Sequence, residues 1–301
     1  MTANSFEIKV PQIFSWQAIL GYLKRETNEV MFQVTEQDRV RRAFKVGTQI
    51  YLCEIAYLPE TGQLKVTVLN GLTLNKTATE LIGVFISEWF DLDEDLSSFY
   101  QMAASDEFLA PLTKRFNGLR LVGMPDFYEA ITWGILGQQI NLGYTYTLKR
   151  RFTEKYGEKI VYEGMNYWIY PTADQVVPAS LEELRELHLT QRKAEYLSDI
   201  SQQITAGKIS KEYYQEMFNA AIAEKTMIKL RGIGPWTANY VLMRCLRKGD
   251  AFPMADIGLL NGIKTIEKLD AKPPVEELQR LKKKWGKWCS YATFYIWRLL
   301  Y

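Results

Sequence analysis

The first part of the chain alternates hydrophobic and polar residues with the two-residue period of β-strands. In residues 63–69, Leu64, Val66 and Val68 lie on one face and polar side chains lie on the other. We therefore expect an antiparallel sheet that buries one face and exposes the other to water. The preceding Glu-Thr-Gly at residues 60–62 predicts a hairpin turn. The expected strands are residues 6–10, 30–35, 40–46, 49–58 and 63–69.

Two further segments of this part have the spacing of amphipathic helices. They are residues 14–25 and 79–90, and we expect both to flank the sheet. The pattern predicts a small α+β domain over residues 1–95. The acidic run 91–95 is expected to be a solvated linker or helix cap, and it sets the predicted domain boundary.

Residues 96–301 show mainly helical periodicity, which predicts a second, mostly α-helical region with two subdomains. Its longest segment contains Gly134, Gly137 and Gly143, and each glycine costs about 1 kcal/mol relative to alanine in a helix interior. Either another backbone packs closely there or the helix breaks into two. The expected helices are residues 96–104, 107–116, 127–156, 181–187, 191–206, 211–223, 224–230, 237–248, 257–266, 275–285 and 288–300.

Length and charge narrow the possible functions only slightly. A chain of 301 residues is long enough for about two domains. Its 37 basic and 35 acidic residues leave a formal charge of +2, so any positive surface must be local. The basic clusters 149–151 and 282–284 are expected to be solvated faces. Because the sequence shows no secretory signal and no apolar run of membrane-spanning length, we expect a cytoplasmic protein.

The cysteines and the histidine argue against several kinds of site. Cys53, Cys245 and Cys289 are odd in number and far apart, so no disulfide framework is expected. Each cysteine is expected to be a small buried residue in a reducing compartment. The single histidine, His188, excludes a histidine dyad and a His-rich metal site, and we place it in a loop or at a helix end.

Residues 230–258 contain the most informative pattern in the chain. Gly232 and Gly234 stand one residue apart, and Pro235 follows them at the start of a segment free of helix breakers. Proline suits the first helical turn because the N–H that it lacks would have no partner there. The glycines leave the helix N-terminus bare. Bare amides and the helix dipole favour an anion, for which a nucleic-acid phosphate is a natural candidate.

The wider pattern resembles the helix-hairpin-helix superfamily of DNA base-excision glycosylases. It reads L-x-G-I-G-P-W-T-A from Leu230 and then F-P-x-x-D ending at Asp256. The resemblance implies that Gly232, Gly234 and Trp236 contact the DNA backbone. It also implies that Asp256, 20 residues beyond Trp236, is the catalytic carboxylate. Since an aspartate before a helix is a good N-cap, capping is an alternative role, or an additional one.

The residue type at position 236 distinguishes families within this superfamily. Members that also cut the DNA backbone carry a lysine there, which forms a Schiff base with the sugar. Trp236 instead resembles the DNA-3-methyladenine glycosylase II family, which removes alkylated bases. This resemblance implies a base pocket of Trp236, Tyr240 and Trp288, whose aromatic faces would attract a cationic base. Core packing is the alternative role for each of the three rings.

The resemblance extends to the motif GILGQQIN at residues 134–141. It places Gln139, with Gln138 beside it, where relatives insert a wedge into the gap left by an extruded nucleotide. Helix capping is the alternative for both glutamines. The resemblance further implies a monovalent cation, sodium or potassium, on main-chain carbonyls of the hairpin. No other cofactor is expected, because the chain lacks the four cysteines of the iron–sulfur cluster found in some relatives. The implied carbonyls belong to Ile228, Leu230 and Ile233.

These features predict a monofunctional glycosylase that acts as a monomer on double-stranded DNA containing damaged bases. Loss of a base builds positive charge on the sugar, which a fixed carboxylate such as Asp256 would stabilise. A purine methylated at ring nitrogen 3 or 7 is already cationic and leaves as a neutral base, so one carboxylate is enough. The alternatives are a glycosylase for oxidised or deaminated bases, and a catalytically silent protein that only binds lesions.

Overall fold

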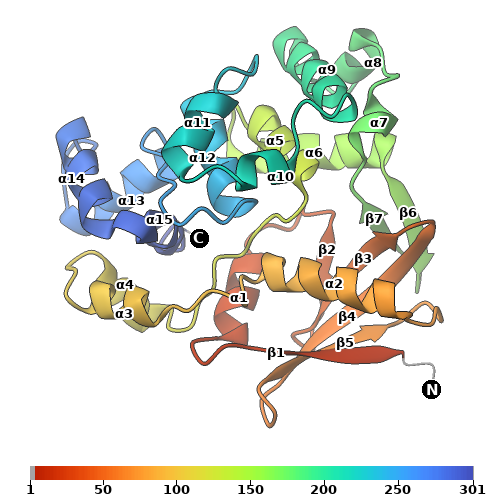
Figure 1. The fold of residues 1–301 in the computed structure, drawn as a ribbon, viewed down its shortest axis with the longest axis horizontal. Helices are drawn as coiled ribbons and strands as arrows, with labels where there is room; N and C mark the ends of the chain where they lie inside the picture. The colour runs from red at the N-terminus through yellow and green to blue at the C-terminus, as the bar shows by residue number, and fades with distance from the viewer. Residues whose placement is uncertain (1–3, 301) are drawn as a thin grey trace.

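The computed structural model describes residues 4–300, and its N-terminal part is a five-stranded antiparallel sheet (Figure 1). The strands lie in the order β1-β5-β4-β3-β2. All five expected strands are confirmed, with small differences at their ends. Their bounds are β1 (Ser5–Lys9), β2 (Phe32–Val34), β3 (Val40–Val46), β4 (Gln49–Leu58) and β5 (Gln63–Val68).

One face of the sheet is buried, as the alternation predicts. Val40, Ile55 and Val66 are paired across three strands and are fully buried. Helix α2 (Lys76–Trp89) lies across this face in Figure 1. The other helix of this part is α1 (Trp16–Leu23), which precedes β2. Both expected flanking helices are therefore present.

A second, two-stranded sheet covers part of the opposite face. It consists of β6 (Glu158–Tyr162) and β7 (Met165–Ile169), and its Tyr167 is buried against Ala43 and Leu52. The expectation that this face is entirely wet is therefore wrong. The turn at Glu163 and Gly164 has φ values of 49° and 75°, the geometry of a two-residue hairpin turn.

The rest of the described chain is mostly helical, as predicted. The segment 127–156 is broken at residues 137–141, which confirms the second of the two explanations for its glycines. The predicted division of residues 211–230 at 223 is wrong, because Asn219 caps a helix that begins at Ala220. The helices are α3 (Ser97–Ala104), α4 (Leu109–Arg115), α5 (Phe127–Leu136), α6 (Leu142–Tyr156), α7 (Ala173–Val176), α8 (Leu181–Glu186), α9 (Gln191–Thr205), α10 (Lys211–Gln215), α11 (Ala220–Met227), α12 (Pro235–Arg244), α13 (Ile257–Glu267), α14 (Val275–Trp285), the 3-10 helix η1 (Gly286–Trp288) and α15 (Cys289–Trp297).

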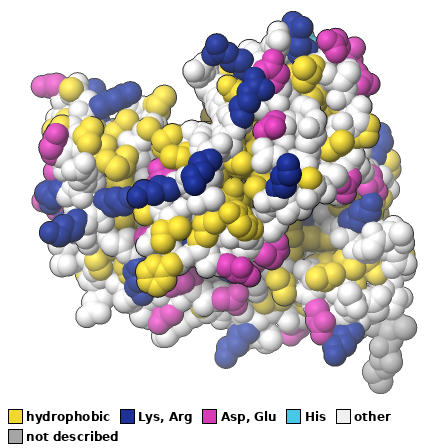
Figure 2. Space-filling model, turned by 45° about the horizontal axis from the view of Figure 1, so that its top comes forward, with side chains coloured by type: hydrophobic (Ala, Val, Ile, Leu, Met, Phe, Trp, Pro, Cys, Tyr) yellow, Lys and Arg dark blue, Asp and Glu magenta, His cyan; other side chains and the backbone are white. Residues whose placement is uncertain are grey.

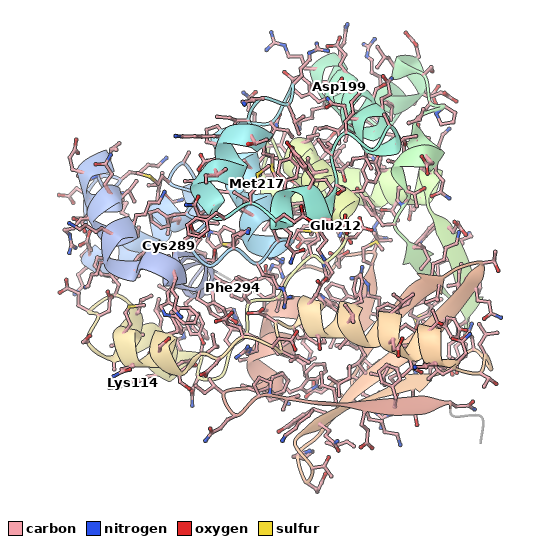
Figure 3. The ribbon with its side chains drawn as sticks, viewed as in Figure 1. Lys114, Asp199, Glu212, Met217, Cys289 and Phe294 are labelled. Carbon is pink, nitrogen blue, oxygen red and sulfur yellow. The ribbon has the colours of Figure 1, made fainter. Side chains whose placement is uncertain are left out.

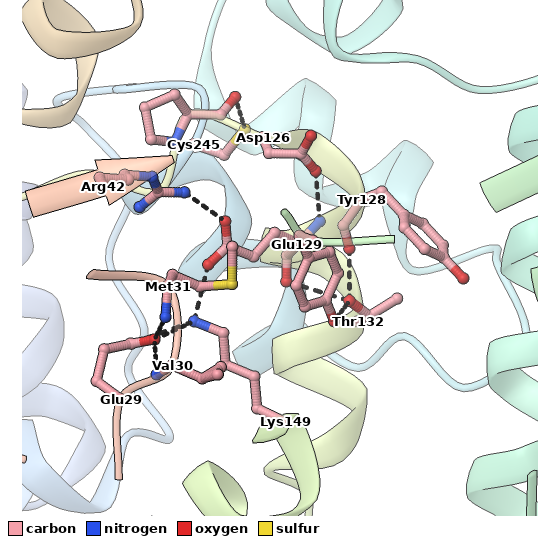
Figure 4. A network of polar contacts seen from close by, with 12 residues as sticks. Glu29, Val30, Met31, Arg42, Asp126, Tyr128, Glu129, Thr132, Lys149 and Cys245 are labelled. Carbon is pink, nitrogen blue, oxygen red and sulfur yellow. Dashed lines mark hydrogen bonds and ion pairs between the residues drawn. The ribbon is translucent and has the colours of Figure 1, made fainter. Parts of the chain in front are cut away.

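A buried cluster of charges joins the sheet domain to the helical region (Figure 4). Lys149 of α6 is 1% exposed, and its Nζ lies 2.8 Å from a carboxylate oxygen of Glu129 and 3.1 Å from one of Glu29. Arg42 of β3 pairs with the same Glu129 at 3.4 Å. The expectation of a solvated face is therefore wrong at Lys149, because two carboxylates balance its charge in the interior.

Asp91 departs from the expectation of a solvated acidic linker. It is buried, accepts a hydrogen bond from the Tyr291 hydroxyl and pairs with Arg247 at 3.2 Å. The helices that follow it pack against α15, where the Tyr100 and Tyr295 hydroxyls lie 2.9 Å apart. The chain around residue 95 is thus well packed, and the domain boundary there stays a prediction.

The cysteines are buried and unpaired, as expected. Burial raises the pKa of the Cys53 and Cys289 thiols to about 12. Figure 3 shows Cys289 on the same helix as Phe294, which is fully buried. His188 follows α8 with a φ of 67°, which confirms its place at a helix end. Between residues 4 and 300, none of the helices combines the length and hydropathy that crossing a bilayer requires.

Candidate active site

Helices α11 and α12 form a hairpin whose turn contains both glycines of the motif. Gly232 has a φ of 86°, a left-handed conformation that favours glycine. A Cβ at this position would lie 2.2 Å from Cγ of Tyr196, so the turn packs directly against α9. Gly234 is the N-cap of α12 without a side-chain capping bond, and Pro235 is the first helical residue. A Cβ on Gly234 would meet no atom within 4 Å, so the space before this helix end is open.

The turn between α5 and α6 lies against the hairpin. Nε2 of Gln138 donates to the Gly232 carbonyl at 2.7 Å, whereas Gln139 is exposed and has a φ of 56°. Capping of α6 falls to Asn141, whose Oδ1 accepts from the Tyr144 amide at 2.8 Å, so the capping alternative for the glutamines is wrong. The structure also separates the two wedge candidates. Gln138 is anchored to the hairpin, and Gln139 projects from the turn.

Asp256 is the N-cap of α13, and it also lines a large cavity in the protein. Its Oδ1 accepts from the Leu259 amide at 2.6 Å and from Nε1 of Trp297 at 2.7 Å. Its Oδ2 accepts from Nε1 of Trp236 at 2.7 Å. The residue is 8% exposed. Because a carboxylate has about four acceptor sites, three donors fix its orientation and still leave it able to face a ligand.

The cavity has a volume of about 1260 Å³ and lies between Asp256 and the turn at residues 137–141. Aromatic rings form one wall of it. Trp236 and Tyr240 have ring centroids 5.6 Å apart, and Tyr240 stacks on Trp297 at 6.2 Å. Burial raises the pKa of Tyr240, so its hydroxyl is protonated at neutral pH. The wall offers flat apolar faces of the kind that would hold a planar base.

Trp288 does not line this cavity, which corrects the predicted base pocket. It is 5% exposed and packs on Phe99 and Tyr291, at centroid distances of 5.6 Å and 5.9 Å. Trp297 lines the cavity at the position that was expected for Trp288. Three tryptophans occur between residues 285 and 297. Only the packing of α15 shows which of them faces Asp256.

Several cavity residues were missed because they come from the other end of the chain or carry no motif. Tyr22 and Arg25 reach the cavity from the end of α1, and Arg244 reaches it from the end of α12. More than 200 residues separate the two groups in the sequence. Nothing in the local pattern around Arg25 signals a site. For Arg244 the only available signal was its position one helical turn after Tyr240, which places both side chains on the same face of the helix.

The hairpin turn is compatible with the predicted cation. Ile228 directly follows the last turn of α11, where carbonyl groups have no intrahelical donor. The Leu230 carbonyl accepts from the Ile233 amide at 3.1 Å and keeps a second lone pair. Over residues 4–300, no three His, Cys, Asp or Glu side chains come together in a way that would hold a metal. Main-chain oxygens therefore remain the ligands to test.

The hairpin, the cavity and the capped aspartate lie together and form one candidate site. Residues 132–287 match the family model described as HhH-GPD superfamily base excision DNA repair protein. Residues 5–126 match the AlkA N-terminal domain. The chain belongs to the HhH-GPD superfamily, and it is a DNA glycosylase.

Individual relatives agree with this family assignment. The chain is 42% identical to a DNA-3-methyladenine glycosylase of Bacillus subtilis, over 98% of this chain and 96% of the relative. It is 28% identical to DNA-3-methyladenine glycosylase 2 of Escherichia coli, over 60% of each chain. The predicted family resemblance is thus confirmed.

Solved structures confirm the fold. A 3-methyladenine DNA glycosylase from Archaeoglobus fulgidus superposes with a TM-score of 0.83 at 21% identity, covering 97% of both chains. An 8-oxoguanine glycosylase/lyase from Clostridium acetobutylicum gives a TM-score of 0.75 at 18% identity, covering 98% of this chain and 96% of the other. The names of these two enzymes refer to different damaged bases, so the fold alone does not give the lesion.

Proposed function

We propose that this protein is a monofunctional glycosylase that removes alkylated purines such as 3-methyladenine from double-stranded DNA and leaves an abasic site. The observation that carries the proposal is the Asp256 carboxylate, held by two indole N–H groups in the wall of an aromatic cavity. The name of the Bacillus relative supports alkylated bases as the substrate class. The expected cytoplasmic location and monomeric state stay predictions.

In the proposed reaction the damaged base enters the cavity and its sugar lies beside Asp256. As the C–N bond lengthens, positive charge develops on the sugar, and the carboxylate stabilises that charge. Trp236 and Trp297 hold the carboxylate in one orientation, so little reorganisation is needed during the step. Water then adds to the sugar carbon and releases a proton to the solvent. A methylated purine departs neutral, which removes the need for a general acid.

The absence of an amine at position 236 supports hydrolysis without strand cleavage. A lyase step needs an amine that forms a Schiff base with the sugar. Here the position holds an indole, whose nitrogen donates to Asp256 at 2.7 Å. Among the described residues, the cavity is lined by arginines but by no lysine. We therefore expect no covalent intermediate with DNA.

DNA binding would use the bare start of α12. Amides near Gly232, Gly234 and Trp236 would approach a phosphate, and a cation on the carbonyls of Ile228, Leu230 and Ile233 would add positive charge there. Gln139 would enter the gap left by the extruded nucleotide. On the face shown in Figure 2, Lys and Arg side chains form a row with hydrophobic side chains beside it. A local surface of this kind can contribute salt-dependent affinity despite a net charge of +2.

The test is incubation of the purified protein with methylated duplex DNA, followed by chromatography of the released bases. We expect free methylated purines, strand breaks only after mild alkali, and no adduct on borohydride treatment. A protein that binds the DNA but releases no base would support the silent lesion-binding alternative. Release of oxidised bases alone would support the other alternative.

A further inference from the structure

A buried lysine of helix α9 is bound to the end of helix α5. Lys193 is 7% exposed, and its Nζ donates to the Leu136 carbonyl at 2.7 Å. Within residues 4–300, no carboxylate lies close enough to form an ion pair with this ammonium group, and burial lowers its pKa. Because a buried charge is costly unless a partner compensates it, the carbonyl contact is the main compensation that the interior offers to Lys193.

The Leu136 carbonyl stands where the chain leaves α5 and enters the turn at residues 137–141. Helix α5 ends at Leu136, and the last carbonyls of a helix have no intrahelical donor. A cation is favourable at this end because it also opposes the helix dipole. Three residues later Gln139 has a φ of 56°. Lys193 therefore fixes the start of the turn from which Gln139 projects.

The same helix also supports the turn of the α11–α12 hairpin. Tyr196 follows Lys193 by three residues, so both side chains lie on one face of α9. The Tyr196 ring packs on Gly232, where an added Cβ would lie 2.2 Å from Cγ. The Arg231 guanidinium carbon lies 5.6 Å from the centroid of this ring, and Arg231 pairs with Glu195. Helix α9 thus holds both turns.

The two turns are also bonded to each other. Nε2 of Gln138 donates to the Gly232 carbonyl at 2.7 Å. Behind them α5 and α12 pack closely, since an added Cβ on Gly134 would lie 2.4 Å from Cγ2 of Thr237. In the proposed function one turn carries Gln139 and the other binds the DNA backbone. Their separation must then match the distance between a phosphate and the gap left by the extruded nucleotide.

We propose that Lys193 is a positioning residue for base release, which holds the turn at residues 137–141 where Gln139 can enter the DNA. This inference rests on the proposed function, since insertion of Gln139 is part of it. Lys193 is not among the residues that line the cavity, so it acts through the turn. Without its ammonium group the turn loses an anchor to α9, and the extruded nucleotide is held out of the duplex less effectively.

The test combines Lys193→Met with Gln139→Ala in a double-mutant cycle. Release of methylated purines from duplex DNA is measured in single turnovers at saturating protein. We expect Lys193→Met to slow release by about tenfold, as for the loss of one charge-assisted hydrogen bond. The double variant should be no more than about twofold slower than the slower single variant, because residues that act through one another are not additive.

A second readout does not require cleavage of the base. The fluorescence of 2-aminopurine placed beside the lesion rises when the damaged base leaves the stack. In the Asp256→Asn background, Lys193→Met should lower this signal at saturating protein, and Lys193→Arg, which keeps a charged donor, should restore it. Melting temperatures measured on the same variants separate loss of folded protein from loss of insertion.

Arg192→Met is the matched control. Arg192 precedes Lys193 on α9 and is exposed, so this variant removes the same charge without removing the donor to Leu136. Its release rate and its fluorescence at saturating protein should match those of wild type. Lys193→Gln serves as a second variant if the methionine variant does not fold, because it removes the charge and shortens the side chain.

Each outcome decides between the possibilities. A folded Lys193 variant that matches wild type in both readouts would overturn the inference. So would a double variant slowed by the product of the two single effects, because Lys193 would then act independently of Gln139. If wild type released no base, the proposed function would fail, whereas the fluorescence signal would still decide whether Lys193 positions the turn.

Discussion

At the scale of single residues, the proposed chemistry depends on the charge of Asp256. Asp256→Asn keeps the shape of the side chain but removes the charge that would stabilise the cationic sugar. We expect the single-turnover rate of base release to fall by about 100-fold or more. DNA affinity, measured by fluorescence anisotropy with a lesion-containing duplex, should stay close to that of wild type. Activity within tenfold of wild type would rule out the proposed role.

Two tryptophans provide a matched pair of substitutions. Trp297→Phe removes the N–H that donates to Oδ1 of Asp256 at 2.7 Å but keeps an aromatic ring. We expect base release to slow by about tenfold, since the carboxylate loses one of its orienting donors. Trp288→Phe changes only the core around Phe99, so it should lower the melting temperature and leave the rate of release per folded molecule unchanged. If Trp288→Phe slowed base release and Trp297→Phe did not, the base pocket would contain Trp288 rather than Trp297.

The sequence predicted the residues that carry a motif and missed those that depend on packing. The family resemblance implied the Asp256 carboxylate, and the structure shows this residue in contact with Trp236. The choice between Trp288 and Trp297 depends on which side of α15 faces the cavity, and no local pattern gives that. Arg25 depends on how the sheet domain sits on the helical region.

At the scale of elements, the hairpin turn depends on the absence of a side chain at Gly232. Gly232→Ala would strain a left-handed residue, by roughly 1 kcal/mol or more, and would also drive a methyl group into Tyr196. We expect weaker binding to duplex DNA and a lower melting temperature. Gly207→Ala is the control, because Gly207 has a φ of 66° but has no atom within 4 Å of an added Cβ.

The two glycine variants distinguish the effect of backbone strain from the effect of the contact between residue 232 and Tyr196. Both should lower stability through the backbone, but only Gly232→Ala should reduce DNA affinity, measured at fixed salt concentration. Equal DNA affinity in the two variants would show that the packing of the hairpin on α9 does not matter for binding.

Most elements were predictable because local periodicity reflects the face that each one buries. The five strands of the first sheet follow that rule, whereas the glycines of residues 127–156 indicated the break in the helix after Leu136. The β6–β7 hairpin was missed although Glu163-Gly164 is a hairpin turn, because its short strands alternate only weakly. It is stable through Tyr167, which packs on a different sheet.

At the scale of the whole molecule, Lys149 links the two parts of the chain through Glu29 and Glu129. Lys149→Met would leave Glu29 without its ion-pair partner and Glu129 with Arg42 alone, a loss of about 3–5 kcal/mol. We expect a large fall in the free energy of unfolding, measured by urea denaturation. The exposed Lys76, which lies 3.8 Å from Glu80, gives the control, since Lys76→Met should change stability by less than about 1 kcal/mol.

The same cluster predicts how stability depends on pH. Burial alone would raise the pKa of Glu29, but Lys149 and the Met31 amide outweigh burial and hold this pKa below its ordinary value of 4.5. A carboxyl with a lowered pKa in the folded state contributes stability above its unfolded pKa and loses it as the pH falls. We therefore expect the melting temperature of wild type to drop below about pH 4.5.

The variant without the lysine should respond in the opposite direction. In Lys149→Met, burial would act on Glu29 without its main compensating charge, so the pKa would rise and stability would decline as the pH increases through it. Melting curves of both proteins over the acidic range check the sign. Parallel curves would show that Lys149 is not what sets the ionisation of Glu29.

Because Tyr22 and Arg25 line the cavity from the N-terminal part of the chain, both halves of the sequence contribute to the proposed binding surface. Recombination that joined this helical half to the first half of a divergent paralogue would retain Asp256 and its indoles but rebuild the opposite wall. Such chimaeras offer a route by which lesion range can change while the cleavage chemistry is inherited intact.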